Sequence, residues 1–297
     1  MAVGVTSGRA HSGELRGIGL ALMAVLLFGL MDAASKFLAA RYPITQIVWL
    51  RFVFTIPLAL LLLPPRTALA RLRSARPWLQ LVRSTVLVVE IALVVWCFGR
   101  MPLADVHGLL ALTPLAVTAL AGPCLGERVG PWRWAAVAVG FVGVLVILRP
   151  GLGVTQSAAL VVLVCVLLYS VYQILTRIVG RVDSAETTLL WQLLVGAVLL
   201  GLVAPLVWRM PEPRHWPLFI LVAALGGVAH WAMIRALQLA PAATIQPFTY
   251  TLLIWAVVIG WLAFGDLPDL WTFIGAGAIV GAGIFTAWRE HGLRERV

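Results

Sequence analysis

Apolar runs as long as the hydrocarbon core of a bilayer recur along the whole chain. A helix needs about 20 apolar residues to cross that core, and about ten such segments can be placed. Backbone groups in lipid must be hydrogen-bonded within the protein, so these runs predict transmembrane helices and an all-α integral membrane protein. The expected spans lie near 16–40, 44–63, 77–99, 103–121, 132–148, 156–178, 186–207, 216–238, 242–263 and 270–288.

The composition excludes a soluble domain. Apolar residues make up 62% of the chain and charged residues 11%, and the mean hydropathy is +1.00. A soluble domain is about half apolar and a quarter charged. The net charge of +10 comes from arginines at the ends of apolar runs, so we attribute it to topology and expect lipid but no nucleic acid as a partner. The three cysteines show no metal-ligand spacing, and we expect no metal and no cofactor.

The charges of the connecting segments predict the orientation. About thirteen cations fall on one side of the predicted membrane and about six on the other, which places both termini in the cytoplasm. Residues 1–15 are expected to form a disordered tail and residues 289–297 a basic tail. Asp32 and Lys36 stand where a signal-peptide cleavage site would have to lie, so the first run is interpreted as a span.

Two stretches of the chain match at a constant offset of 139 positions. A glycine, an acid and, five residues after the acid, a tryptophan recur in the same order. We interpret the match as an internal duplication, with a first repeat over 16–149 and a second over 156–288. The matched pairs are Pro102 with Pro241, Ala104 with Ala243, Gly126 with Gly265, Glu127 with Asp266, Trp132 with Trp271, and Trp134 with Phe273.

An odd number of spans in each repeat determines how the repeats are oriented. Each holds about five spans, so the second must enter the membrane upside down relative to the first. Inverted repeats are the architecture of many secondary transporters, with the substrate site near the midplane between them. Glycines within the spans favour close helix packing; they include Gly140, Gly143, Gly226, Gly227, Gly275, Gly277, Gly281 and Gly283.

Two segments carry a resemblance to a known family. Gly-Glu-Arg-Val-Gly-Pro-Trp-Arg-Trp at 126–134 and Phe-Gly-Asp-Leu-Pro-Asp-Leu-Trp at 264–271, with the span pattern over 16–288, resemble the drug/metabolite transporter superfamily, EamA type. Val-Val-Glu-Ile-Ala-Leu at 88–93, Pro102 and Leu-Thr-Pro at 112–114 are similar to the YddG-type amino-acid exporters. That resemblance implies export of aromatic and other neutral amino acids.

Ionisable residues inside the predicted spans are candidates for function, because charge in lipid is costly. They are Asp32, Arg51, Arg83, Glu90 and Arg235. Asp32 and Lys36 are four residues apart, so we interpret them as an ion pair within one helix. Arg83 and Arg235 lie near the cytoplasmic ends of their spans and are expected to snorkel. Arg51 is interpreted as structural if it pairs with Asp32.

Glu90 falls near the middle of its span, too deep to snorkel. The repeat offset carries it to Ala229, next to His230, so an acid and an imidazole approach the centre from opposite repeats. A carboxylate there can grip an ammonium group or hold a proton. The alternative for both residues is a structural hydrogen bond to a neighbouring span.

Neutral polar residues are expected to complete a central pocket. Tyr169, Tyr172, Gln173 and Thr176 share one face of a helix, and the other candidates are Gln246, Tyr250, His107 and Thr113. For any one of them an interhelical hydrogen bond is the alternative. Pro114 and Pro247 are expected to break or kink their helices.

The chain has no P-loop, HExxH or GxSxG motif, so no enzyme activity is indicated. With the resemblance, we expect a monomeric secondary transporter of the bacterial inner membrane that exports amino acids or similar small metabolites by alternating access. Whether a proton is coupled stays open, and Glu90 is the candidate carrier if it is. The alternatives are another solute class (nucleoside, sugar, carboxylate or drug), a membrane-embedded lipid enzyme, or a scaffold.

Overall fold

Every regular element in the described part of the chain is helical. The computed structural model describes residues 4–62, 72–125, 130–148, 156–239, 245 and 248–294. Seven apolar helices there are long enough to cross a membrane and three more are shorter, so the predicted all-α membrane fold is confirmed. The helices are α1 (Gly4–Ala39), α2 (Ile44–Leu62), α4 (Pro77–Phe98), α5 (Leu103–Leu110), α6 (Thr113–Leu125), α7 (Pro131–Leu148), α8 (Gln156–Val179), α9 (Ala185–Gly201), α10 (Trp216–Leu239), α12 (Thr251–Phe264) and α13 (Leu270–Arg294), with 3-10 turns η2 (Ala204–Val207) and η3 (Pro213–His215) between α9 and α10.

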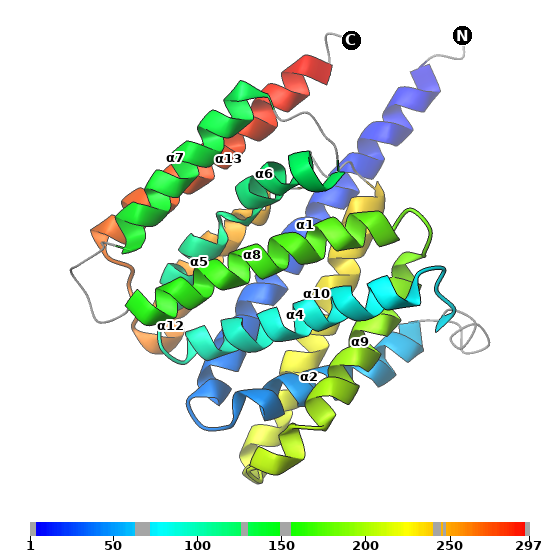
Figure 1. Ribbon diagram of the computed structural model, residues 1–297, viewed down its shortest axis with the longest axis vertical. Coiled ribbons are helices and arrows are strands. Elements are labelled where there is room, and N and C mark those ends of the chain that lie inside the picture. The colour runs from blue at the N-terminus through cyan, green and yellow to red at the C-terminus, as the bar shows by residue number, and fades with distance from the viewer. Residues whose placement is uncertain are drawn as a thin grey trace.

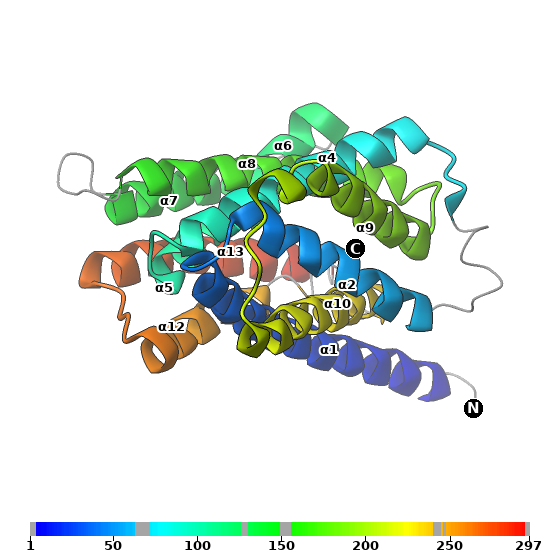
Figure 2. The ribbon, with the colours of Figure 1, turned by 90° about the horizontal axis from the view of Figure 1, so that it is seen from below.

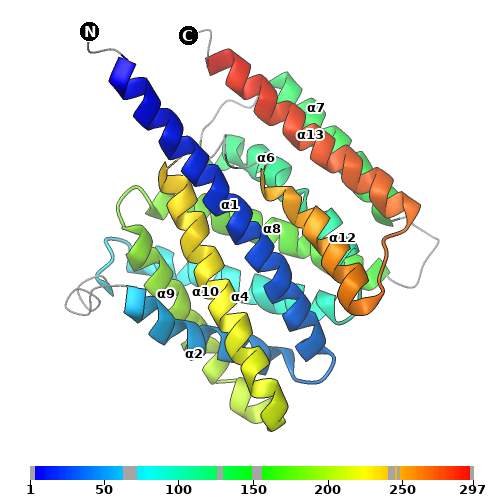
Figure 3. The same ribbon diagram turned by 180° about the vertical axis from the view of Figure 1, so that it is seen from behind.

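The central helices form two layers. Figure 2 shows α4, α8 and α9 in one layer and α1, α2 and α10 in the other. Each layer therefore combines helices from both repeats. Both termini lie at the same end of the bundle, at the top of Figures 1 and 3. Helix α1 begins at Gly4, so the helix includes residues that composition alone assigns to the polar tail.

Most helix contacts have a counterpart, in which each helix is replaced by the equivalent helix of the other repeat. Helix α1 packs against α10, and their repeat counterparts α8 and α4 pack together as well. In the same way α2 packs on α10 while α9 packs on α4, and α12 packs on α1 while α5 and α6 pack on α8. The pairs α7 with α13, α2 with α9 and α5 with α12 are their own counterparts. A largely apolar core runs through both layers.

The fourth predicted span is broken into two helices. Helix α5 ends at Leu110 and α6 begins at Thr113. Pro114 has no N–H to donate to the carbonyl four residues earlier, which interrupts the helical ladder. Tighter bonds replace it, from Leu112 N to Leu109 O at 3.0 Å and from Leu115 N to Leu112 O at 3.0 Å. The predicted break at Pro114 is confirmed, whereas Pro247 lies outside the described residues.

Glycines allow α7 and α13 to approach each other closely. A Cβ added to Gly143 would lie 2.6 Å from the Gly275 carbonyl oxygen, and one added to Gly275 would lie 2.5 Å from the Gly143 carbonyl oxygen. The two backbones are therefore in direct contact, which no other residue type permits. Gly277 and Gly281 on α13 have no described atom within 4 Å of an added Cβ, so packing against the described part of the chain does not require their small size.

Candidate functional site

Three charged side chains from three helices gather in the interior. Asp32 on α1, Arg51 on α2 and Glu90 on α4 are only 8, 8 and 7% exposed. Arg51 lies within electrostatic reach of both carboxylates. No side-chain hydrogen bond joins Arg51 or Glu90 to another of the residues that the structure describes. Burying an ion costs several kcal/mol unless hydrogen bonds compensate it, so this cluster is incompletely satisfied by the protein itself.

Two histidines adjoin the cluster. His230 Nδ1 lies 2.8 Å from the Gly226 carbonyl oxygen, its ring meets Phe28 edge-on at 4.9 Å, and it is within electrostatic reach of Arg51. His107 Nε2 lies 3.2 Å from Asp32 Oδ2. Arg51 thus has Glu90 and His230 as electrostatic neighbours from opposite repeats.

A close backbone approach positions Arg51. A Cβ added at Gly226 would lie 3.3 Å from Arg51 Nε and 2.9 Å from Met31 Sδ. The next residue, Gly227, is equally tight against Leu58 and Thr55. Thr55 Oγ1 donates to the Arg51 carbonyl at 2.6 Å and lies 3.2 Å from the Ala223 carbonyl. The glycine pair therefore lets α10 press on α2 and hold the guanidinium beside His230.

A stacked pair of tyrosines on α8 adjoins the cluster through Tyr169. Tyr169 is 36% exposed and within electrostatic reach of Glu90. Its ring stacks on Tyr172 with 5.5 Å between centroids. Tyr172 donates to Gln192 Oε1 at 3.1 Å, so for Tyr172 the alternative of an interhelical hydrogen bond holds. Gln173 is half-buried on the same helix.

The remaining predicted site residues lie at the helix breaks. Thr113 is buried at the first position of α6, and Tyr250 is buried immediately before α12. The Tyr250 hydroxyl has no hydrogen-bond partner among the described residues and presses on Gly283, where a Cβ would clash with it. Gln246 lies outside the described residues. The structure does not join Thr113 or Tyr250 to the charged cluster through any direct contact it describes.

Two predicted roles are wrong. Lys36 does not pair with Asp32 on its own helix: its Nζ pairs with Asp266 and donates to the Met101 carbonyl at 3.2 Å. Helix packing brings Asp266 closer to Lys36 than Asp32, which lies four residues earlier on the same helix. Arg83 does not snorkel but is fully buried, and it donates to the Thr188 carbonyl at 2.8 Å.

Sequence reasoning did not place Asp32 and Arg51 in the site. Both are costly intramembrane charges, for which the sequence favours a structural pairing. The signal in the sequence is that two carboxylates and one guanidinium fall inside three consecutive spans. Which of these spans face one another depends on packing, and packing is not visible in a single sequence.

Helices from both repeats thus enclose buried, incompletely compensated charges bordered by aromatic rings. Such an arrangement in an apolar, multi-pass helical bundle is typical of membrane transport proteins. The chain belongs to the EamA-like transporter family, whose model matches residues 15–149 and again residues 156–288. It is a multi-pass membrane transporter of small metabolites.

Curated relatives cover nearly the whole chain. A riboflavin transporter of Rhizobium johnstonii is 30% identical over 93% of this chain and 91% of that protein. An S-adenosylmethionine uptake transporter of Rickettsia conorii is 24% identical over 93% of this chain and 94% of that protein. A solved crystal structure, 18% identical, covers 95% of this chain and 99% of its own with a TM-score of 0.65, which shows the same fold.

The comparisons confirm that the chain belongs to the drug/metabolite transporter superfamily. They do not confirm the narrower resemblance to one branch of that superfamily. The relatives are named for riboflavin and S-adenosylmethionine, so the likeness to the YddG-type amino-acid exporters does not extend to these names.

Proposed function

We propose that this chain carries a small metabolite with a planar aromatic part and several polar groups across the bacterial inner membrane, with riboflavin as the first compound to test. The buried Asp32–Arg51–Glu90 cluster carries this proposal. Its guanidinium donates and its carboxylates accept hydrogen bonds, so together they fit a ligand edge that presents both acceptors and donors. The flavin ring has such an edge in its imide group. The whole-length similarity to a riboflavin transporter supports the same choice.

Amino acids are the second candidate, because the cluster holds opposite charges. Arg51 suits the carboxylate of a zwitterion, and Glu90 or Asp32 suits its ammonium group. Tyr169 beside Glu90 offers an aromatic surface to a side chain. The riboflavin-type solute is preferred because a planar ring uses the aromatic border more fully, and because a relative of matching length is named for it.

The mechanism we propose is alternating access between two inverted halves. The paired helix contacts, each with a repeat counterpart, support an exchange of conformations between the halves. Glu90, His230, Tyr169, Gln173, Gln246, Tyr250, His107 and Thr113 remain our proposed substrate-contacting residues, now joined by Arg51 and Asp32.

Counterflow in proteoliposomes tests the proposal. Purified protein preloaded with unlabelled riboflavin should accumulate labelled riboflavin at least about tenfold above empty liposomes. Glu90→Gln and Arg51→Gln should each lower the initial rate about tenfold, because either change removes a group that meets the ligand. Val89→Ala, on the exposed face of the same helix, is the matched control and should transport normally.

Other outcomes decide between the candidates. Exchange of labelled phenylalanine or tryptophan without riboflavin would favour the amino-acid candidate. Exchange of neither compound would reject both. If Glu90→Gln leaves both the rate and its pH dependence unchanged, Glu90 is neither a substrate ligand nor a proton carrier.

A further inference from the structure

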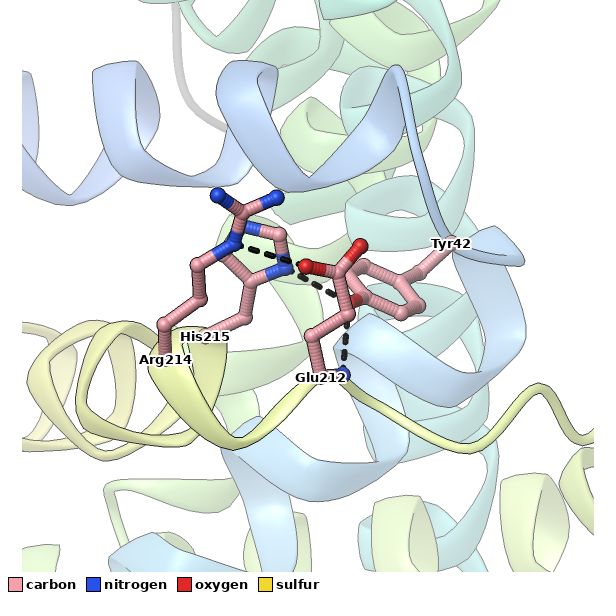
Figure 4. Close-up of polar contacts among 4 residues, drawn as sticks. All are labelled: Tyr42, Glu212, Arg214 and His215. Atoms are coloured by element: carbon pink, nitrogen blue, oxygen red, sulfur yellow. Dashed lines mark hydrogen bonds and ion pairs between the residues drawn. The ribbon is translucent and has the colours of Figure 1, made fainter.

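Two groups of hydrogen bonds tie the repeats together at opposite ends of the bundle. The first, which we call the Tyr42 tie, joins the α1–α2 turn to the α9–α10 connection (Figure 4). Tyr42 Oη lies 2.6 Å from His215 Nδ1 and accepts from the Glu212 amide at 3.0 Å. Gln46 adds two bonds to the backbone of Arg209, at 2.8 and 3.0 Å.

The second group, the Asp183 tie, joins the α8–α9 turn to the end of the α2–α4 connection. The Asp183 carboxylate accepts from the Ser74 hydroxyl, from the Ala75 amide at 2.8 Å and from Gln80 Nε2 at 2.8 Å. Trp191 Nε1 adds a bond to the Leu72 carbonyl at 3.0 Å.

The two ties are counterparts under the repeat. The first repeat's α1–α2 turn corresponds to the second repeat's α8–α9 turn, and the α9–α10 connection corresponds to the α2–α4 connection. Each tie therefore joins the same two segments with the repeats exchanged. The residues differ, a tyrosine–histidine pair in one and a carboxylate in the other, but the segments joined do not.

Exchange symmetry determines which contacts can change during transport. In alternating access by inverted repeats, the second end state is the first with the conformations of the halves exchanged. A contact is then present in the second state whenever its counterpart is present in the first. Both ties are present together, so neither has to break. Contacts that lack their counterpart are the ones that switch.

Helix α4 makes contacts of this second kind. It packs against α1 and α2, while α10, its counterpart, makes no comparable packing against α8 or α9 over the described ranges. The end of α4 meets the end of α1, where a Cβ added at Gly99 would lie 3.6 Å from Ala39 Cβ. The bundle is thus closed at the end opposite the termini.

Lys36 secures this closed end. Its Nζ donates to the Met101 carbonyl just after α4, pairs with Asp266 in the α12–α13 connection, and lies 4.9 Å from the centre of the Phe264 ring. One side chain therefore joins α1 to a segment of each repeat. The counterpart positions Glu127 and Ala240 lie outside the described residues, so the assignment rests on the packing of α4.

We propose that Lys36, Asp266 and the Met101 carbonyl form a gate that opens during transport, while the Tyr42 and Asp183 ties stay intact and act as the fulcrum. This inference rests on the proposed alternating-access function. It assigns the switching role to one end of α1 and α4 and the fixed role to the edge where α2 and α9 pack together.

Reversible cross-linking tests the proposal. Three cysteine pairs in a Cys124→Ser background are linked with a short bis-methanethiosulfonate: Lys36→Cys with Asp266→Cys, Tyr42→Cys with His215→Cys, and Ser74→Cys with Asp183→Cys. Linking the gate pair should lower transport at least about tenfold, with recovery on reduction. Linking either fulcrum pair should leave at least about half the rate, and each single cysteine with reagent is the control. Transport that survives the gate link, or stops reversibly with a fulcrum link, overturns the assignment.

A second measurement works without a known substrate. Spin labels at Arg100→Cys and Leu267→Cys report the gate, and labels at Arg41→Cys and Arg214→Cys report the fulcrum, all at exposed positions. Adding Lys36→Ala should shift the gate pair toward longer distances and leave the fulcrum pair unchanged. Failure of riboflavin transport with this shift present would reject the substrate but not the gate. An unchanged gate distance would reject the gate.

Discussion

The two buried arginines, Arg83 and Arg51, differ in their hydrogen bonds, and this difference indicates a structural role for one and a binding role for the other. Arg83 is fully buried and donates to Gln80, Ser84, Thr176 and the Thr188 carbonyl, with its guanidinium 5.1 Å from the Tyr172 ring centre. Arg51 is also buried, though not completely, and it faces two carboxylates without a side-chain hydrogen bond among the described residues. The satisfied arginine holds helices together, whereas the unsatisfied one has donors left for a ligand.

Also at the residue scale, the Asp183 carboxylate should make the stability of the fold decrease at acid pH. Partial burial raises the pKa of Asp183, but hydrogen bonds from Ser74, Ala75 and Gln80 outweigh that effect and leave the pKa below its usual value. A lowered pKa in the folded state stabilises the fold above the unfolded-state pKa of about 3.9, and this stability is lost as pH falls through the folded value. Between pH 6 and about 3, the melting temperature of wild type should fall more than that of Asp183→Asn.

Thermal unfolding in detergent across this pH range measures the effect. Glu212→Gln is the control, because its ion pair with Arg214 is exposed and such pairs contribute little. Parallel pH profiles for wild type and Asp183→Asn would contradict the prediction.

At the scale of the elements, the close packing of α7 against α13 depends on glycines, which have no side chain at the contact. These helices are each other's repeat counterparts and lie at one side of the bundle (Figures 1 and 3). Small residues let backbones meet in lipid, where no hydrophobic drive brings helices together. Glycine-rich spans predicted close packing, but not which glycines take part, because that depends on which face of each helix meets its neighbour.

Gly143→Val should therefore weaken the α7–α13 contact. Its side chain would meet the Gly275 carbonyl and Ile279 at distances below van der Waals contact, and overpacking of this kind costs about 1–3 kcal/mol. Gly277→Val, on α13 with open space around it, is the matched control. A melting temperature lowered equally by both variants would show that glycine is needed for another reason.

For the whole molecule, the described helices place both termini at one end of the bundle (Figure 1). Which side of the membrane this end faces follows from the distribution of arginines. A fluorescent protein fused to the C-terminus should therefore be bright in cells, and alkaline phosphatase fused there should be inactive. Phosphatase inserted at the exposed Met210, in the α9–α10 connection at the other end, should be active. The reverse pattern would invert the predicted topology.

Much of this architecture is predictable from one sequence because it follows from local chemistry. The long apolar runs require helices, since lipid offers no hydrogen bonds to the backbone. The recurring Gly–acid–Trp pattern indicates the duplication, and Pro114 marks a helix break where its missing N–H interrupts the ladder. Glu90 stands out because a carboxylate in mid-span has no local partner.

Only the tertiary structure decided which distant groups meet. In the structure Lys36 pairs with Asp266 and not with the expected partner on its own helix. Arg83 is buried among polar groups, and Asp32 and Arg51 lie near Glu90. The structure also showed two ties at opposite ends and closure at one end. Helix rotation and layer order set these contacts. They arise from packing summed over many apolar side chains, and residues such as Leu, Ala and Val are too frequent here for their pattern to specify a partner.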